Sequence, residues 1–163
     1  MAQSTRVAPD LTAIRLRPAR AGEEAALSAL CLRSKAHWQY DDAFMAAVAP
    51  YLQVTSEAIA AGHATVAETP AGVPLGVCQI DPEGRGGTLD LLFIEPAVIG
   101  SGVGRELFEH AKAQLRALGH TVMTILSDPD AEPVYLHMGA RRVEMLPSKV
   151  FPGRELPWLE VTL

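Results

Sequence analysis

The stretch Ile94–Arg105, with the sequence IEPAVIGSGVGR, carries glycine at every second position from Gly100 to Gly104. Glycines in such a loop let backbone N–H groups turn toward one anion at a helix N-terminus, where unpaired donors and the helix dipole attract negative charge. A tight strand-to-helix turn that binds nothing would need the same glycines. The loop alone therefore leaves an anion site and a plain turn both open.

The spacing of this loop disfavours two common nucleotide motifs. A dinucleotide-binding motif, G-x-G-x-x-G counted from Gly100, requires glycine where Arg105 stands. A P-loop ends in lysine followed by serine or threonine, whereas Gly104 is followed by Arg105 and Glu106. A pyrophosphate group held by loop amides remains compatible with the sequence.

Composition indicates one globular domain. With 163 residues, 48% of them hydrophobic and 20% charged, the chain can bury a core of its own. We expect a loose tail over residues 1–13, followed by a single domain over residues 14–163. No apolar run approaches the roughly 20 residues that span a membrane, and the first residues lack the layout of a secretory signal. These features predict a cytoplasmic protein that does not contact membranes.

Charge and residue spacing argue against other partners. A net charge of -5 disfavours nucleic acid, whose phosphates require a basic surface. The five histidines are scattered and form no cluster with ligand spacing, so no metal is expected. Cys31 and Cys78 lie in apolar surroundings, which predicts reduced, buried thiols.

Hydrophobic periodicity predicts an α/β (α+β) fold with a mixed sheet and helices on its faces. Strands are expected at 14–20, 63–68, 75–80, 88–94, 121–126, 141–146 and 158–163, and helices at 22–33, 42–51, 103–118 and 131–138. The second to fourth strands should form an antiparallel meander. The glycine loop then follows the strand at 88–94 in a βαβ unit, at the sheet edge where open α/β folds bind ligands.

The stretch LFIEPAVIGSGVGREL, followed by an amphipathic helix, an apolar strand and DPDAEPVYLHMGA, resembles the acetyl-CoA-binding core of the GCN5-related N-acetyltransferase (GNAT) superfamily. The family signature Q/R-x-x-G-x-G/A places its glycines on Gly102 and Gly104. Its first position falls on Ile99, which departs from the pattern. The resemblance covers the element order from residue 14 to 163 and implies a mostly antiparallel sheet of about six or seven strands with about four helices.

The resemblance also implies an activity, transfer of an acetyl group from acetyl-CoA to a primary amine by direct attack. Tyr135, four residues before Gly139, would be the general acid that protonates the departing thiolate, although a helix tyrosine can simply pack against the core. Asp128 would either cap the following helix or touch the cofactor. The positions implied to bind the cofactor through the strand and the loop are Leu92, Phe93, Ile94, Ile99, Gly100, Ser101, Gly102, Val103 and Gly104.

The acceptor amine must lose a proton, so a base is needed. Asp90 is the first candidate and Glu95 the second, while plain alternation allows Asp90 to be a solvent-facing strand residue. In the family, the region matching Ala36–Asp42 walls the acceptor pocket. Its residues Trp38, Tyr40 and Asp41 would bind a small cationic amine, or the segment is an ordinary loop with a helix cap.

Three further expectations concern the C-terminal loop and the rival functions. The loop at 148–158 could close over the acceptor pocket, with Arg154 facing an acceptor carboxylate or forming a surface ion pair. A homodimer is plausible for the family. Two alternatives to an enzyme remain open: a non-catalytic acyl-CoA-binding sensor or regulatory domain, and a structural or interaction domain whose loop binds nothing.

Overall fold

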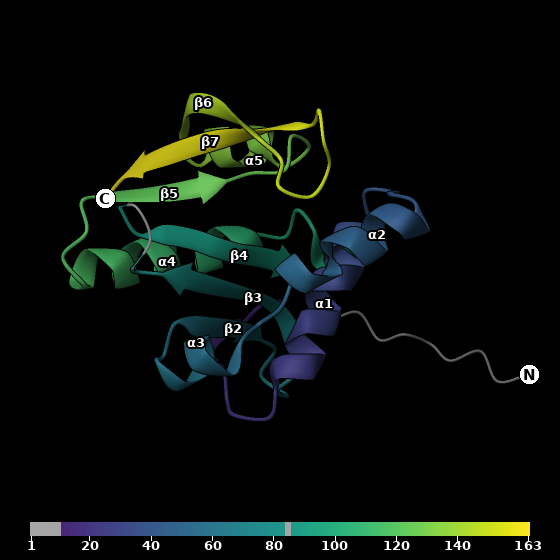
Figure 1. Cartoon of the computed structure of the whole chain (residues 1–163). Coiled ribbons are helices and arrows are strands. Elements are labelled where there is room, and N and C mark those ends of the chain that lie inside the picture. Colours follow the sequence, from purple (N-terminus) through teal and green to yellow (C-terminus); the bar gives the residue numbers. More distant parts are fainter. Residues whose placement is uncertain (1–10, 84–85) are drawn as a thin grey trace, which may run out of the picture.

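The computed structural model describes residues 11–83 and 86–163, which form one sheet flanked by helices (Figure 1). The strands are β1 (Arg15–Pro18), β2 (Ala64–Glu68), β3 (Pro74–Asp81), β4 (Thr88–Ile94), β5 (Val122–Leu126), β6 (Arg141–Pro147) and β7 (Glu155–Thr162). The helices are α1 (Glu24–Ala36), α2 (Asp42–Val48), α3 (Ser56–Ala60), α4 (Val103–Ala117) and α5 (Glu132–His137), with 3₁₀ turns η1 (Ala49–Tyr51) and η2 (Pro96–Val98).

The sheet has the strand order β1-β2-β3-β4-β5-β7-β6. All neighbouring strands run antiparallel except β4 and β5, which are parallel. The predicted mixed, mostly antiparallel sheet and its β2-β3-β4 meander are therefore confirmed. The short helix α3 was not expected. Its N-terminus is capped by the Thr55 hydroxyl, which accepts a hydrogen bond of 3.1 Å from the Ala58 N–H.

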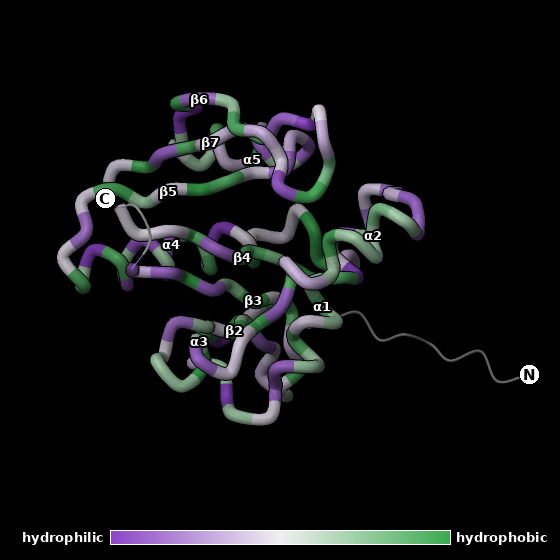
Figure 2. Tube along the Cα trace, viewed as in Figure 1, coloured by the Kyte–Doolittle hydropathy of each residue, from purple (hydrophilic) through white to green (hydrophobic). Residues whose placement is uncertain are grey.

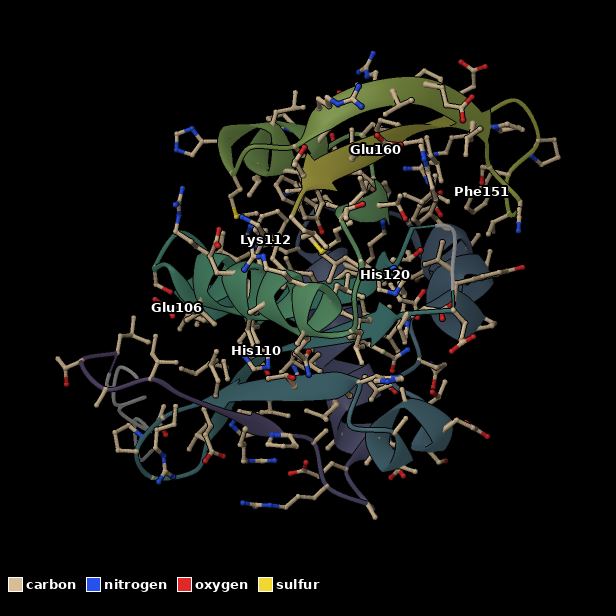
Figure 3. The ribbon with its side chains drawn as sticks, turned by 90° about the vertical axis from the view of Figure 1, so that its left-hand side faces the viewer. Glu106, His110, Lys112, His120, Phe151 and Glu160 are labelled. Carbon is tan, nitrogen blue, oxygen red and sulfur yellow. The ribbon has the colours of Figure 1, made fainter. Side chains whose placement is uncertain are left out.

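Helices cover both faces of the sheet, and each face has its own hydrophobic cluster. Helix α4 packs Val103, Leu107, Phe108, Ala111 and Leu115 against one face, all of them buried. The opposite cluster joins α1, α2 and α3 to the sheet. Figure 1 shows α4 behind the strands and α1 in front of them, and Figure 2 shows apolar, green segments along β4 and β5. The solvent side of α4 carries polar residues such as Glu106 and Lys112 (Figure 3).

The two parallel strands at the centre of the sheet separate almost at once. Among the described residues, β4 and β5 share a single registered pair, Thr88↔Thr124. The two threonine hydroxyls lie 3.0 Å apart, and the Thr124 N–H donates to the Gly87 carbonyl at 2.9 Å. Beyond this point the carboxyl-terminal half of β4 has no strand beside it on the β5 side.

A β-bulge interrupts β4 at Asp90. Gln79 pairs with Leu91 and Ile80 pairs with Leu89, so one residue of β4 has no partner in β3. As a result, Leu89 packs with the α4 cluster, whereas Leu91, two residues later, packs with the α1 cluster. Bulges of this kind redirect side chains in a strand. Here the bulge brings Asp90 to the face on which α1 and α2 lie.

Several other expectations can be compared with the structure. Residues 1–10 of the expected tail lie outside the described residues, while Leu11 packs against the α4 cluster. Cys31 and Cys78 are free and buried, as predicted, and burial raises the pKa of each thiol to about 12. In the described part of the chain, no helix is long and apolar enough to cross a bilayer.

Gly76 on β3 offers a test of the packing between the sheet and α4. A Cβ atom at this position would lie 2.8 Å from Ile94 Cγ2, closer than Cβ atoms approach other atoms in proteins. It would also lie 3.0 Å from Leu107 Cδ1 on α4 and 3.1 Å from the Phe93 carbonyl oxygen, which are both tight contacts. We expect Gly76→Ala to lower the free energy of unfolding in urea by about 1–3 kcal/mol through overpacking.

Gly104→Ala is the matched control for this variant. A Cβ at Gly104 would meet only Ile94 Cδ1, at 3.8 Å, and the residue lies in the first turn of α4. Alanine favours helix by up to about 1 kcal/mol over glycine. The unfolding free energy of Gly104→Ala should therefore stay level or rise, and equal losses in both variants would contradict this account.

Candidate active site

A cavity of about 440 Å³ opens where β4 and β5 separate. The end of β4, the glycine loop, α5 and the C-terminal end of α1 enclose it. It is lined by Ser34, Lys35, Trp38, Leu92, Phe93, Ile94, Ile99, Gly100, Gly102, Gly104, Arg105, Asp128, Ala131, Val134, Tyr135, His137 and Met138. Most of these side chains are apolar. We call this space the first cavity.

The glycine loop presents unpaired N–H groups to the first cavity. Gly100 and Gly102 adopt φ angles of 82° and 96°, which side chains rarely adopt, and Gly102 is the N-cap of α4. No described residue accepts a hydrogen bond from the N–H groups of residues 102–105. Arg105, which pairs with no described carboxylate, adds a cation to the same lining. This end of the cavity suits an anion.

The backbone of β4 lines the cavity beside the loop. The Glu95 N–H donates to the Leu75 carbonyl at 2.8 Å, and backbone groups alternate along an antiparallel ladder. The N–H and C=O groups of Leu92 and Ile94 therefore point away from β3, to the side that β5 leaves open. By the same alternation, the Phe93 amide points toward β3. Phe93 lines this cavity and also a second, adjoining cavity.

Tyr135 on α5 lines the first cavity and packs beside Phe108, with ring centroids 6.1 Å apart. Its hydroxyl makes no hydrogen bond to any described residue. Burial, with smaller contributions from Cys78 and Asp128, raises the pKa of the phenol above its usual value. Tyr135 is therefore protonated at neutral pH and keeps its proton available to a group in the cavity.

A second cavity of about 280 Å³ adjoins the first and shares Lys35, Phe93 and Asp128 with it. The bulged half of β4, α1, η1 and the β6–β7 loop surround this space. Its other lining residues are Val48, Tyr51, Leu52, Thr88, Leu89, Asp90, Leu91, Leu126, Ser148, Lys149, Val150, Phe151, Arg154 and Leu156. Figure 3 places Phe151 on the β6–β7 loop, above the helices that cover this face.

Asp128 lies between the two cavities and binds three side chains from distant parts of the chain. Its carboxylate accepts hydrogen bonds from the Lys35 ammonium group, from the Tyr40 hydroxyl at 2.8 Å and from the Arg154 guanidinium at 3.2 Å. We call these four residues the Asp128 cluster. The carboxylate also accepts the Asp130 N–H at 2.9 Å, which fixes the turn before α5.

Electrostatics hold Asp128 in its ionised form. Burial alone would raise the pKa of this carboxyl, but hydrogen bonds from Lys35, the Asp130 N–H and Tyr40 outweigh it and leave the pKa below its usual value. In turn, burial and the hydrogen bonds to Asp128 and Asp130 raise the pKa of the Tyr40 hydroxyl. The cluster is thus a neutral phenol and two cations around one carboxylate.

Asp90 reaches the second cavity from the β4 bulge and is held by one side chain. The Gln79 Oε1 atom accepts the Thr55 N–H at 3.2 Å, so its amide nitrogen donates to the Asp90 carboxylate, at 2.8 Å. Desolvation by the surrounding protein raises the pKa of Asp90, although the side chain keeps contact with solvent. The sequence-predicted base therefore lies in a cavity. Glu95, the second candidate, is paired with Arg33 and lines neither cavity.

The three predicted acceptor residues lie in different places. Trp38 lines the first cavity, Tyr40 belongs to the Asp128 cluster, and Asp41 caps α2 by accepting the Phe44 N–H at 2.7 Å. Sequence reasoning missed Lys35, Arg105 and Lys149, which line the cavities. A cation on an amphipathic helix or a loop gives no local signal that it faces a cavity.

Comparison with known proteins agrees with this arrangement. Residues 21–149 match the family described as the Acetyltransferase (GNAT) domain. The chain belongs to the GNAT acetyltransferase family. The sequence resemblance and the GNAT fold that it implied are therefore confirmed. A search among curated proteins gave no matching sequence.

Three solved structures illustrate how widely the fold is shared. A GCN5-related N-acetyltransferase from Rhodopseudomonas palustris is 19% identical, with a TM-score of 0.72 over 91% of this chain and 95% of that one. The PaiA N-acetyltransferase from Thermoplasma acidophilum, solved with coenzyme A, is 12% identical, with a TM-score of 0.74 over 93% and 99%. Apo YjaB from Escherichia coli is 23% identical, with a TM-score of 0.67 over 92% and 97%.

Because Asp128 is ionised in the folded protein, we expect the free energy of unfolding to depend on pH. A carboxyl whose pKa falls below its usual value of 3.8 on folding stabilises the native state above that value, and this contribution is lost as the pH falls through 3.8 toward the folded pKa. We expect Asp128→Asn to lower the unfolding free energy by about 2 kcal/mol at pH 7, with the difference from wild type shrinking below pH 4. Urea titrations from pH 7 to 3.5 measure it.

Asp130→Asn serves as the control, because Asp130 contacts Tyr40 but neither cation of the Asp128 cluster. At pH 7, Asp130→Asn should lower the free energy of unfolding by less than Asp128→Asn does. A loss in Asp128→Asn that is the same at every pH would show that the carboxylate charge is not what stabilises the cluster.

Proposed function

We propose that this GNAT protein transfers an acetyl group from acetyl-CoA to a primary amine by direct attack. One observation carries the proposal: unpaired amides at the N-terminus of α4 and the open edge of β4 face a first cavity that adjoins a second cavity containing Asp90. The arrangement offers one compartment for the acyl donor and one for the acceptor. We further propose a single domain over residues 14–163 that works in the cytoplasm on a small-molecule amine.

The residues of the first cavity fit coenzyme A. The N–H groups of residues 102–105 and the guanidinium of Arg105 would hold the pyrophosphate without the side chain that Ile99 replaces. The open backbone groups of Leu92 and Ile94 would bind the pantetheine arm as a neighbouring strand does. The PaiA structure, which contains coenzyme A, supports this choice of cofactor.

When bound, acetyl-CoA would supply an activated acyl group. Asp90 accepts a proton from the ammonium form of the acceptor, for which its raised pKa makes it a stronger base than an exposed aspartate. The amine nitrogen then bonds to the acyl carbon as the carbon–sulfur bond breaks. Tyr135 would donate its phenolic proton to the departing sulfur, and the second proton that the nitrogen loses as it becomes an amide would restore the phenol. Buried Cys31 and Cys78 line neither cavity, and a direct transfer needs no enzyme thiol.

Calorimetric titration with coenzyme A and an assay of thiol release with an amine panel test the proposal together. Arg105→Gln tests the binding arm, because Arg105 lines the first cavity and pairs with no described carboxylate, so its replacement should leave the fold intact. We expect the affinity of this variant for coenzyme A to fall about tenfold. Absence of binding to the wild-type protein would overturn the proposal and favour a domain whose loop binds nothing.

Tyr135→Phe distinguishes an enzyme from a cofactor-binding sensor. The variant keeps the ring that packs on Phe108 but loses the proton donor, so kcat should fall about 100-fold or more. The affinity for coenzyme A should stay within about twofold of wild type. Normal turnover in this variant would remove Tyr135 as the general acid, and binding without turnover in the wild-type protein would identify a sensor.

A further inference from the structure

The second cavity carries more positive than negative charge. Lys35, Lys149 and Arg154 line it, against two carboxylates, Asp90 and Asp128. A pocket for a dicationic or simple cationic amine would need the opposite balance, because burying ammonium groups beside unpaired cations is unfavourable. The charge of the cavity therefore limits which amines can enter it.

The carboxylate of Asp128 is already neutralised within its cluster. Lys35, Arg154, Tyr40 and the Asp130 N–H all donate to it, so it has little capacity left for a ligand. Asp90, which accepts one hydrogen bond from Gln79, is the carboxylate that remains available. Of the cations, Lys35 is committed to Asp128, whereas Lys149 pairs with no described residue.

Arg154 retains unused donors and is held by aromatic packing. Only its Nη2 atom makes hydrogen bonds to described residues, at 3.2 Å to Asp128 and 3.5 Å to Tyr40. Its guanidinium carbon lies 4.9 Å from the Phe44 ring centroid, and that ring stacks between Tyr40 and Phe151 at centroid distances of 4.0 and 4.7 Å. A guanidinium fixed this way is preorganised to bind an anion through its remaining N–H groups.

From this arrangement we infer that the acceptor is a small zwitterion, a primary amine that also carries an acidic group. The acidic group binds Arg154 and Lys149 on the β6–β7 loop, and the amine lies at Asp90 on β4, next to Phe93 and the first cavity. The cavity volume of about 280 Å³ suits a molecule of amino-acid size. This inference rests on the proposed acetyl transfer and replaces the cationic acceptor that the sequence favoured.

Matched acceptors test the inference with the full chain. β-Alanine carries a carboxylate where 3-aminopropanamide carries a neutral amide and 1,3-diaminopropane carries a second ammonium group. Phosphoethanolamine and its neutral partner ethanolamine make the same comparison for a phosphate. We expect kcat/KM for β-alanine or phosphoethanolamine to exceed that of its neutral partner by about tenfold or more. The diamine should be the poorest acceptor of the five.

Lys149→Gln assigns the preference to this cavity, since Lys149 is exposed and unpaired and its replacement should not disturb folding. The acid-to-neutral ratio of kcat/KM should fall at least threefold. Lys112→Gln removes the same charge from α4, on the other face of the sheet, and should keep the wild-type ratio.

Each outcome separates this inference from the proposed function. Turnover with equal rates for acidic and neutral amines, or a preference for the diamine, would overturn the zwitterionic acceptor and leave acetyl transfer standing. A preference that Lys149→Gln and Lys112→Gln reduce equally would overturn the assignment to this cavity. Coenzyme A binding without turnover of any amine would overturn both proposals.

Discussion

The separation of β4 from β5 is the constraint on which the rest of the molecule depends. A parallel pair held at Thr88↔Thr124 leaves the following residues of β4 with open backbone groups, and such groups are costly when buried without a partner. A ligand that forms strand-like hydrogen bonds would satisfy them. The first cavity, the glycine loop and Tyr135 are all arranged around this opening, so the sheet itself creates the proposed donor site.

The Asp128 cluster lies beside the same opening, between the two cavities. Lys35 comes from α1, Tyr40 from the loop before α2, Asp128 from the turn after β5 and Arg154 from the β6–β7 loop. Four segments thus meet at one carboxylate between the two cavities. Because two cations share a single negative charge, part of the positive potential remains directed at the second cavity.

Sequence predicted the fold and the first cavity better than the second. Local structure is encoded by the glycine spacing, the apolar strand of residues 88–94 and the YLHMG segment. Local patterns of this kind can be recognised in a single sequence. The second cavity is formed by residues from five separate segments, so its charge depends on tertiary contacts that no spacing encodes. Of the residues expected at the acceptor pocket, Tyr40 donates to Asp128, and Asp41 caps α2, which is the alternative that the sequence left open for this segment.

The bulge at Asp90 has a consequence for how readily this site can change. Leu89 and Leu91 face opposite clusters, which is the alternation that two directly adjacent strand residues would have. Removing Asp90 would therefore restore a regular ladder and keep both hydrophobic clusters intact. Neither hydrophobic cluster includes Asp90, whose carboxylate accepts a hydrogen bond from Gln79. A different side chain at this position would therefore change the chemistry of the pocket while the apolar contacts of the core stay in place.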